Sequence, residues 1–204
     1  MINLSKGSII SLKKNETNLE NIYIGVNWGK ISNVTSSFFG LFKDTSYENV
    51  DLDASVAVFD QHNKLLDRIF FNKTHSDDNS IIHSGDDRAG DSSNDDDDNE
   101  VISVNLKKIR SDAEKIVFFI NSYKGQEFDT IPYSKIRILD NTEGRKVPFA
   151  QFNLSAQPEF KTKKSMVMAK VLREKDGWKF VTIGEATSTL KIDDTIALIQ
   201  AQYL

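Results

Sequence analysis

The stretch Ser55–Phe71, SVAVFDQHNKLLDRIFF, decides the fold that we expect for this chain. Two runs rich in Val, Ile, Leu and Phe, Ser55–Phe59 and Leu65–Phe71, are separated by the polar joint Asp60–Asn63. Short apolar runs with tight polar joints are typical of antiparallel strands, whereas alternating βα units need longer connections. The stretch therefore predicts a pair of neighbouring antiparallel strands in an all-β protein.

Runs of the same kind continue along the chain. A second tight joint, Glu174–Gly177, ends in Asp-Gly, where glycine accepts the positive φ that a hairpin turn requires. The other expected strands are Ser8–Leu12, Ile22–Asn27, Ile81–His83, Val101–Leu106, Lys115–Ile120, Lys135–Leu139, Phe149–Leu154, Met166–Leu172 and Trp178–Ile183. Their spacing predicts an antiparallel β-sandwich.

Only the end of the chain has a helical period. Ile192, Ile196, Ile199 and Tyr203 are spaced four, three and four residues apart, with acids in the first turn. We expect a short C-terminal helix that closes one end of the sandwich.

Composition favours one globular domain over residues 1–204. Hydrophobic residues make up 39% of the 204 residues, which is enough to bury a core without cross-links, and there is no Cys. Neither a linker nor an internal repeat divides the chain. Met1–Lys14 has no apolar core of a secretion signal, and no run approaches the roughly 18 apolar residues of a spanning helix, so we expect a soluble cytoplasmic protein.

The acidic residues are concentrated in one segment. Between Gly85 and Glu100 the chain has eight Asp and Glu residues and a single base, Arg88. The whole chain has 30 acids and 26 bases, so the remainder is slightly basic. A segment of this charge repels nucleic acid, and we expect no nucleic-acid partner.

A hard divalent cation would relieve the repulsion among these carboxylates. Calcium accepts six to eight oxygen ligands in flexible geometry, magnesium is stricter, and zinc prefers His or Cys. A solvated acidic loop without metal remains the alternative, and the EF-hand spacing is absent. A second acidic element, Asp51-Leu-Asp53, favours calcium because its two acids share one face of a strand.

Several motifs along the chain together resemble the TerD family of tellurium-resistance and stress proteins. These motifs are Asp51–Ser55 (DLDAS), His83–Asp87 (HSGDD), the acidic stretch ending in Glu100–Ile102, and Glu114–Val117 (EKIV). The resemblance extends, in the family's order, to Leu4–Gly7, Gly25–Trp28, Arg137–Asp140, Gly177–Phe180 and Gly184. It covers nearly the whole chain and implies a β-sandwich with calcium sites.

The resemblance also implies a set of calcium ligands. By position these are Asp51, Asp53, Asp86, Asp87, the carbonyl groups of Arg88 and Gly90, Asp91, Asp98 and Glu100. The pattern departs from the family at Asp87, Ala89, Asp91 and Asn99, where the family usually has Asn, Thr, Glu and an acid. The segment Ser92–Asp97 is longer than usual, which leaves open which of Asp95, Asp96 and Asp97 coordinate.

Two enzyme patterns are incomplete. Gly25–Lys30 (GVNWGK) is one residue short of a phosphate-binding loop and is followed by Ile31 instead of Ser or Thr. His83, Ser84 and Asp86 are too close in sequence to converge as a hydrolytic triad. We therefore expect His83 to be a strand-end side chain and the protein not to be an enzyme.

The segment Ser36–Phe42 (SSFFGLF) is an apolar stretch between polar flanks. We expect it to fold back onto the sandwich, with insertion into a membrane surface as the alternative. The sequence thus predicts a calcium-binding stress-response module that acts through protein partners. The alternatives are a metal-dependent enzyme acting on an oxyanion or hydrolysable substrate, and a calcium-dependent membrane-surface binder.

Overall fold

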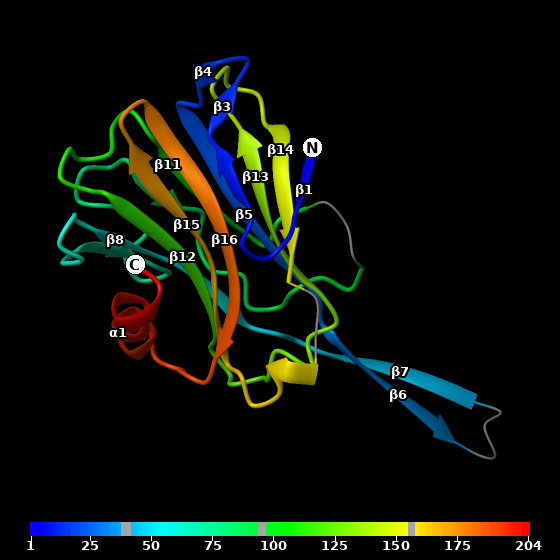
Figure 1. The fold of residues 1–204 in the computed structure, drawn as a ribbon. Coiled ribbons are helices and arrows are strands. Elements are labelled where there is room, and N and C mark those ends of the chain that lie inside the picture. The colour runs from blue at the N-terminus through cyan, green and yellow to red at the C-terminus, as the bar shows by residue number, and fades with distance from the viewer. Residues whose placement is uncertain (38–41, 94–96, 155–157) are drawn as a thin grey trace.

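The computed structural model describes residues 1–37, 42–93, 97–154 and 158–204, which form a β-sandwich (Figure 1). One six-stranded sheet has the spatial order β1 (Ile2–Leu4), β14 (Val147–Asn153), β13 (Ser134–Asp140), β5 (Asn21–Trp28), β11 (Glu100–Asn105) and β10 (Ile81–His83). The facing sheet has the order β2 (Ile9–Ser11), β16 (Gly177–Thr187), β15 (Ser165–Glu174), β12 (Lys115–Ser122), β8 (Leu52–Phe59) and β9 (Leu65–Ile69). We call them the first and second sheets.

Smaller elements complete the described chain. The strands β3 (Lys13–Lys14) and β4 (Thr17–Asn18) pair with each other, as do β6 (Ile31–Ser37) and β7 (Phe42–Glu48). A 3₁₀ turn, η1, spans Pro158–Phe160, and the helix α1 spans Ile192–Gln202. Each strand expected from the sequence overlaps an observed strand, whereas β1, β3, β4, β6 and β7 were not predicted.

Both tight joints connect antiparallel neighbours as predicted. The first joins β8 to β9 and the second joins β15 to β16. The turns require left-handed backbone at Asn63, with φ of 64°, and at Gly177, with φ of 126°. The strand pairs are antiparallel with one exception among the described strands, because β1 runs parallel to β14.

The core between the sheets follows from alternation along the strands. On β5, Ile22, Ile24, Val26 and Trp28 all point inward and are at most 1% exposed. Residues of β8 are buried on both faces, because Ala54, Val56 and Val58 enter the main core while Ala57 and Phe59 join a second cluster outside the sheet.

The helix α1 forms as predicted, but its expected position was wrong. Instead of closing an end of the sandwich, α1 lies against the outer face of the second sheet, where Ile196 and Ile199 pack with Phe59 and Phe119 (Figure 1). The reason is that this outer face is apolar at Ala57, Phe59, Val117, Phe119 and Val167. A sheet face of this kind must be covered, and the apolar side of α1 covers it.

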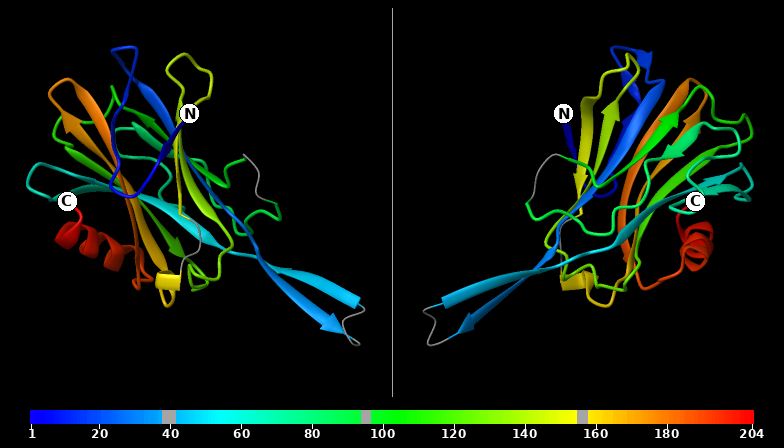
Figure 2. Two further views of the ribbon diagram at one scale, coloured as in Figure 1. Left: turned by 45° about the vertical axis from the view of Figure 1, so that its right-hand side comes forward. Right: turned by 180° about the vertical axis from the view of Figure 1, so that it is seen from behind.

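The segment around Ser36–Phe42 was expected to fold back onto the sandwich, and this expectation was wrong for its described flanks. The strands β6 and β7 pair from Ile31↔Glu48 to Ser37↔Phe42 and form a ribbon that projects from the body (Figure 2). Residues 38–41 lie outside the described residues.

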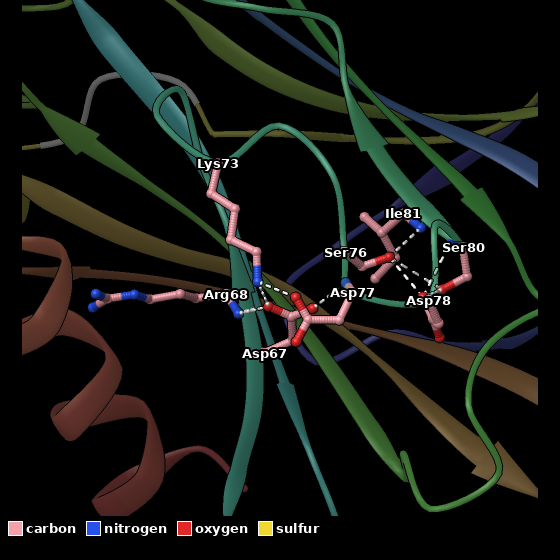
Figure 3. A network of polar contacts seen from close by, with 8 residues as sticks. All are labelled: Asp67, Arg68, Lys73, Ser76, Asp77, Asp78, Ser80 and Ile81. Atoms are coloured by element: carbon pink, nitrogen blue, oxygen red, sulfur yellow. Dashed lines mark hydrogen bonds and ion pairs between the residues drawn. The ribbon is translucent and has the colours of Figure 1, made fainter.

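Side chains organise the connection from β9 to β10 (Figure 3). Asp67 accepts hydrogen bonds from Lys73 Nζ and the backbone N–H of Asp77, at 2.6 and 2.8 Å. Asp78 Oδ1 accepts from the hydroxyl groups of Ser76 and Ser80, and Ser76 Oγ in turn accepts the N–H of Ile81. These bonds determine where β10 begins, and β10 leads directly into the acidic segment.

Candidate metal centre

Three carboxylates converge at one end of the second sheet. Asp51, Asp53 and Asp86 each contribute an oxygen, and these oxygens lie within 4.8 Å of one another. Asp51 and Asp53 are buried at 4% and 5% exposure, whereas Asp86 is exposed. We call these three residues the acid cluster. It contains oxygen ligands only, which are the ligands that hard divalent cations prefer.

Strand geometry brings the cluster together. Asp51 and Asp53 flank Leu52 at the start of β8, so their side chains emerge on the same face of the sheet. Asp86 arrives from the segment that follows β10 in the opposite sheet. Pairing with β12 holds β8 in place, because the N–H of Tyr123 donates to Asp51 O at 2.9 Å.

His83 and Glu100 connect the two sheets beneath the cluster. The strand β9 ends its pairing with β8 at Val56, so the backbone of Ala54 has no strand partner on that side. Glu100 Oε2 accepts the Ala54 N–H at 2.8 Å, and His83 Nε2 lies 3.0 Å from Ala54 O. The two side chains therefore substitute for the missing strand. This confirms that His83 is a strand-end side chain, and it gives Glu100 a role in the fold.

Hydrogen bonding defines the state of His83. Its Nδ1 accepts the N–H of Gly85 at 3.0 Å, so Nε2 carries the hydrogen that points to Ala54 O and to Glu100, 3.3 Å away. Burial lowers the pKa of His83, but the hydrogen bond and charge of Glu100 outweigh it and raise the pKa. Burial raises the pKa of Glu100, although His83 opposes this.

The acid cluster is electrostatically strained without a cation. Burial, followed by the charges of Glu100 and Asp51, raises the pKa of Asp53 to about 7. Burial also raises the pKa of Asp51, against the opposing charge of Lys124, whose Nζ lies 3.8 Å from Asp51 Oδ2. Arg88 Nε donates to Asp86 at 2.8 Å. Two basic side chains thus stand where a cation would be favourable.

Other predicted ligands lie apart from the acid cluster and contact the protein itself. Asp87 Oδ1 accepts the N–H groups of Ala89 and Gly90, and its Oδ2 accepts from the amide of Asn99. The same Asn99 amide donates to Asp91 Oδ1 at 3.1 Å. In this segment an amide NH₂ therefore bridges two carboxylates. Coordination by Asp87, Gly90 and Asp91 stays a prediction.

The side chain of Asp98 pairs with a base of the first sheet. It forms an ion pair with Arg137 of β13 at 2.8 Å, with both side chains nearly buried. Gly25 makes room for this carboxylate, because a Cβ at Gly25 would lie 2.1 Å from Asp98 Oδ2. Asp95 and Asp96 lie outside the described residues, and Asp97 O accepts a hydrogen bond from Asn27 Nδ2. Coordination by Asp98 and by Glu100 also stays a prediction.

Sequence reasoning missed the residues that surround the acids. Lys124, Arg137 and Asn27 come from three different strands or strand ends. Asn27 and Arg137 lie within motifs of the family resemblance, but nothing in the sequence assigned any of the three residues a role beside the acids. Their proximity depends on strand pairing, as when β12 places Ser122 opposite Leu52. Only a correct register could have predicted Lys124 beside Asp51.

The acidic segment is also hydrogen-bonded to the residues that flank the two strands of the ribbon, which we call its two legs. The N–H of Lys30 donates to Asp91 O at 2.9 Å, and the N–H of Val50 donates to Ala89 O at 3.1 Å. Trp28 Nε1 spans the two legs by donating to Val50 O. Trp28 is fully buried. The acidic segment and the base of the ribbon are therefore joined by backbone hydrogen bonds.

Comparisons with known proteins agree with this architecture. The family model described as the TerD domain matches residues 1–192. The chain is 33% identical to tellurium resistance protein TerX of Serratia marcescens, covering 92% of this chain and 94% of that protein. It is 29% identical to stress response protein SCP2 of Bacillus subtilis (strain 168), covering 96% and 98%.

A solved structure has the same fold. It is described as a homologue of telluride resistance protein (TerD) from Streptomyces coelicolor A3(2), and it matches with a TM-score of 0.63 at 13% identity. The match covers 90% of this chain and 96% of that chain. Among the described residues, no helix is both long enough and apolar enough to span a bilayer.

Proposed function

This chain belongs to the TerD family, and from that premise we propose that it is a calcium-binding stress-response module. In this proposal the protein works in the cytoplasm, is not an enzyme, and acts through calcium-dependent interaction with protein partners. The membership supports the stress-response part, because the relatives carry the names of tellurium-resistance and stress-response proteins.

The observation that carries the calcium proposal is the convergence of Asp51, Asp53 and Asp86. Burial and neighbouring charges raise the pKa of Asp51 and Asp53, so a divalent cation bound between these carboxylates and Asp86 would stabilise their charged forms. The donor set argues for a hard ion, because the nearby His83 uses both ring nitrogens in the fold. Calcium is favoured over magnesium because one of the three acids comes from a loop, and calcium tolerates irregular oxygen geometry.

The position of the acid cluster supports the proposal of calcium-dependent interaction. The segment that carries Asp86 is hydrogen-bonded to the base of the projecting ribbon. A cation that holds this segment would thereby hold the ribbon, whose exposed residues include Tyr47 at 54% exposure. We infer that the ribbon presents the surface that a protein partner contacts.

The test of the calcium site is thermal unfolding of the wild type and of Asp53→Asn, with and without calcium. Calcium at about 100 times its Kd should add about 2.7 kcal/mol to the free energy of unfolding. For a domain of this size, this corresponds to a rise in Tm of roughly 5–11 °C. Asp53→Asn should lose most of the rise, because it removes a charged ligand and changes little in shape.

The matched control is Asp112→Asn. Its carboxylate pairs with Arg110 and is not among the predicted ligands, so the variant should keep the full calcium-dependent rise. A full rise in Asp53→Asn would show that the acid cluster is not the site. Magnesium at the same concentration should produce a smaller rise than calcium, and an equal rise would refute the choice of calcium.

A further inference from the structure

The ribbon formed by β6 and β7 has two open edges. Its strands pair with each other from Ile31↔Glu48 to Ser37↔Phe42 without a shift in register. Neither strand pairs with any other strand that the structure describes, and the ribbon projects from the body (Figure 2). Each of the two strands therefore presents a row of N–H and C=O groups that no described strand satisfies.

The edges of the two six-stranded sheets are protected against pairing with another chain. The outermost strands β1, β2 and β10 are each three residues long. The remaining outermost strand, β9, has five residues and contains Asp67 and Arg68. Short edge strands and charged residues are two devices by which proteins prevent the association of sheet edges.

The strand β6 lacks both devices. It has seven residues, ISNVTSS, with no charged residue and no Pro, and its Ile, Val and Thr favour extended backbone. The other strand of the ribbon, β7, contains Lys43, Asp44 and Glu48. The two edges of the ribbon thus differ, because only the edge of β6 is neutral. That edge is the one suited to accept a further strand.

A second copy of the chain can supply that strand. Among the outermost strands that the structure describes, only β6 and β7 have seven residues, so the second copy's β6 is the neutral strand of matching length. Antiparallel pairing centred on Val34 places Val34 opposite the second copy's Val34. It also places Ser32 opposite Ser36 and Asn33 opposite Thr35 of the second copy. Every pair in this register is uncharged, so no like charges oppose the association.

This pairing would also complete the ribbon. A two-stranded ribbon is marginally stable in water, whereas the paired ribbons form one sheet of four strands in the order β7, β6, β6, β7. Because the two β6 strands run in opposite directions and each ribbon projects from its body, the two sandwiches lie at opposite ends of the joint sheet (Figure 2). The strands left outermost are the two charged β7 strands. They stop further addition, so the assembly closes as a dimer.

We propose that the chain forms a twofold dimer by antiparallel pairing of β6 with the β6 strand of a second copy. This inference goes beyond the calcium proposal and requires no cation. The strand β7, with Tyr47 54% exposed, stays available to a different protein partner. Seven paired residues make an interface smaller than the standard size of about 1,600 Å². We therefore expect a weak dimer, with a dissociation constant above about 1 µM.

Sedimentation equilibrium of the full chain tests the association. The mass should rise from 23.1 kDa toward twice that value as the concentration approaches about 1 mM, in calcium and in a chelator alike. Val34→Lys places two like charges opposite each other across the twofold axis and should raise the dissociation constant at least about tenfold. Thr45→Lys, at the position of β7 that pairs with Val34, is the matched control and should leave the dissociation constant unchanged.

A charge pair separates lost pairing from lost folding. Val34→Glu should weaken the dimer as Val34→Lys does, whereas an equimolar mixture of the two variants should associate at least as tightly as the wild type. Opposite charges then face each other across the axis. Association of the mixture also shows that both variants are folded.

A single cysteine tests the register, because the chain has no Cys of its own. Opposite residues of an antiparallel pair have Cα atoms about 4.5–5.5 Å apart, a distance that a disulfide can bridge. In oxidised glutathione, Val34→Cys should therefore form a disulfide-linked dimer, and Thr45→Cys should not. The products are separated by electrophoresis without reductant.

Four results would each overturn the proposal: a mass of 23.1 kDa at every concentration, equal dissociation constants for the wild type and Val34→Lys, a larger effect of Thr45→Lys than of Val34→Lys, or no disulfide in Val34→Cys. A monomer would leave a strand of a different protein as the occupant of the β6 edge. A monomer whose Tm still rises with calcium would refute this inference and leave the calcium proposal intact. A dimer without a calcium-dependent rise in Tm would refute the calcium proposal alone.

Discussion

Single carboxylates of the acidic segment differ in what their oxygens contact, although they are alike in sequence. Asp86 joins Asp51 and Asp53, whereas Asp98 pairs with Arg137 and Asp87 caps two N–H groups. The charges of Asp87 and Asp98 are thus compensated by donors within the protein, whereas the buried Asp51 and Asp53 repel each other in the absence of a cation. This is why the acid cluster, and not the whole segment, is the strongest candidate for metal binding.

Asp78 provides a test of pH dependence at a single residue. Burial would raise its pKa, but hydrogen bonds from the hydroxyl groups of Ser80 and Ser76 and from backbone N–H groups lower it to about 2. A depressed pKa stabilises the fold above the unfolded value of 3.8, and this stabilisation is lost as the pH falls toward 2.

We therefore expect Asp78→Asn to cost about 1 kcal/mol at pH 5, because it replaces charge-assisted hydrogen bonds by neutral ones. The cost should shrink between pH 4 and pH 2, as wild-type Asp78 becomes protonated. Urea unfolding of both proteins across this range measures the difference, in which the other carboxylates cancel. A difference that is constant with pH would refute the assignment.

Gly90 provides a second test at the residue scale. Its φ is +72°, and a Cβ would lie 2.8 Å from Trp28 Cδ1. Gly144 is the matched control, because its φ is +74° and a Cβ there would meet nothing within 4 Å. Gly144→Ala should cost about 1–2 kcal/mol for the left-handed backbone alone, and Gly90→Ala should cost more. Equal costs in urea unfolding would mean that Trp28 moves aside freely.

Among the elements, the ribbon formed by β6 and β7 depends most on the hydrogen bonds at its base for its stability. A two-stranded ribbon is marginally stable by itself in water. Here Lys30 and Val50 donate to the acidic segment, Trp28 joins the two legs, and Gln126 donates to Asn49 O. The base of the ribbon is thus part of the same structure that positions Asp86.

This arrangement predicts that calcium acts on the ribbon. Amide exchange at Lys30 and Val50 should slow on addition of calcium, because a bound cation restricts the segment whose carbonyls accept these two N–H groups. In Asp53→Asn the slowing should disappear. Asn63, in the β8–β9 turn, is the internal control, and its exchange should not change. Slowing at the acid cluster without any effect at Lys30 or Val50 would separate the ribbon from the metal centre.

At the scale of the whole molecule, the helix α1 completes the second sheet. Ile199 is fully buried and Ile196 nearly so, and both pack on the outer apolar cluster. The covering of this sheet face therefore depends on one short C-terminal element.

Ile199→Ala should lower the free energy of unfolding by about 2–5 kcal/mol, through lost burial and the cavity left behind. Gln202→Ala, at an exposed position of the same helix, should change it by less than about 0.5 kcal/mol. Urea unfolding measures both values. A cost below 1 kcal/mol for Ile199→Ala would mean that α1 is loosely held and that the sheet face does not require it.

The sequence by itself determined the elements that depend on neighbours in the chain. Alternation and turn residues predicted β8 and β9 with their joint, and the four-three-four spacing of Ile192, Ile196, Ile199 and Tyr203 predicted α1. The period-two placement of Asp51 and Asp53 indicated one shared face. These features follow from backbone periodicity and turn chemistry, which operate over a few residues.

Tertiary structure alone decided which elements and side chains that are distant in sequence lie next to each other. The position of α1, the projection of the ribbon and the pairing of Asp98 with Arg137 all depend on contacts between residues far apart in sequence. A run of similar acids does not reveal which carboxylate will converge with Asp53 and which will meet a base. Strand order and register make that choice, because they set the distance between side chains, and coordination and charge depend on that distance.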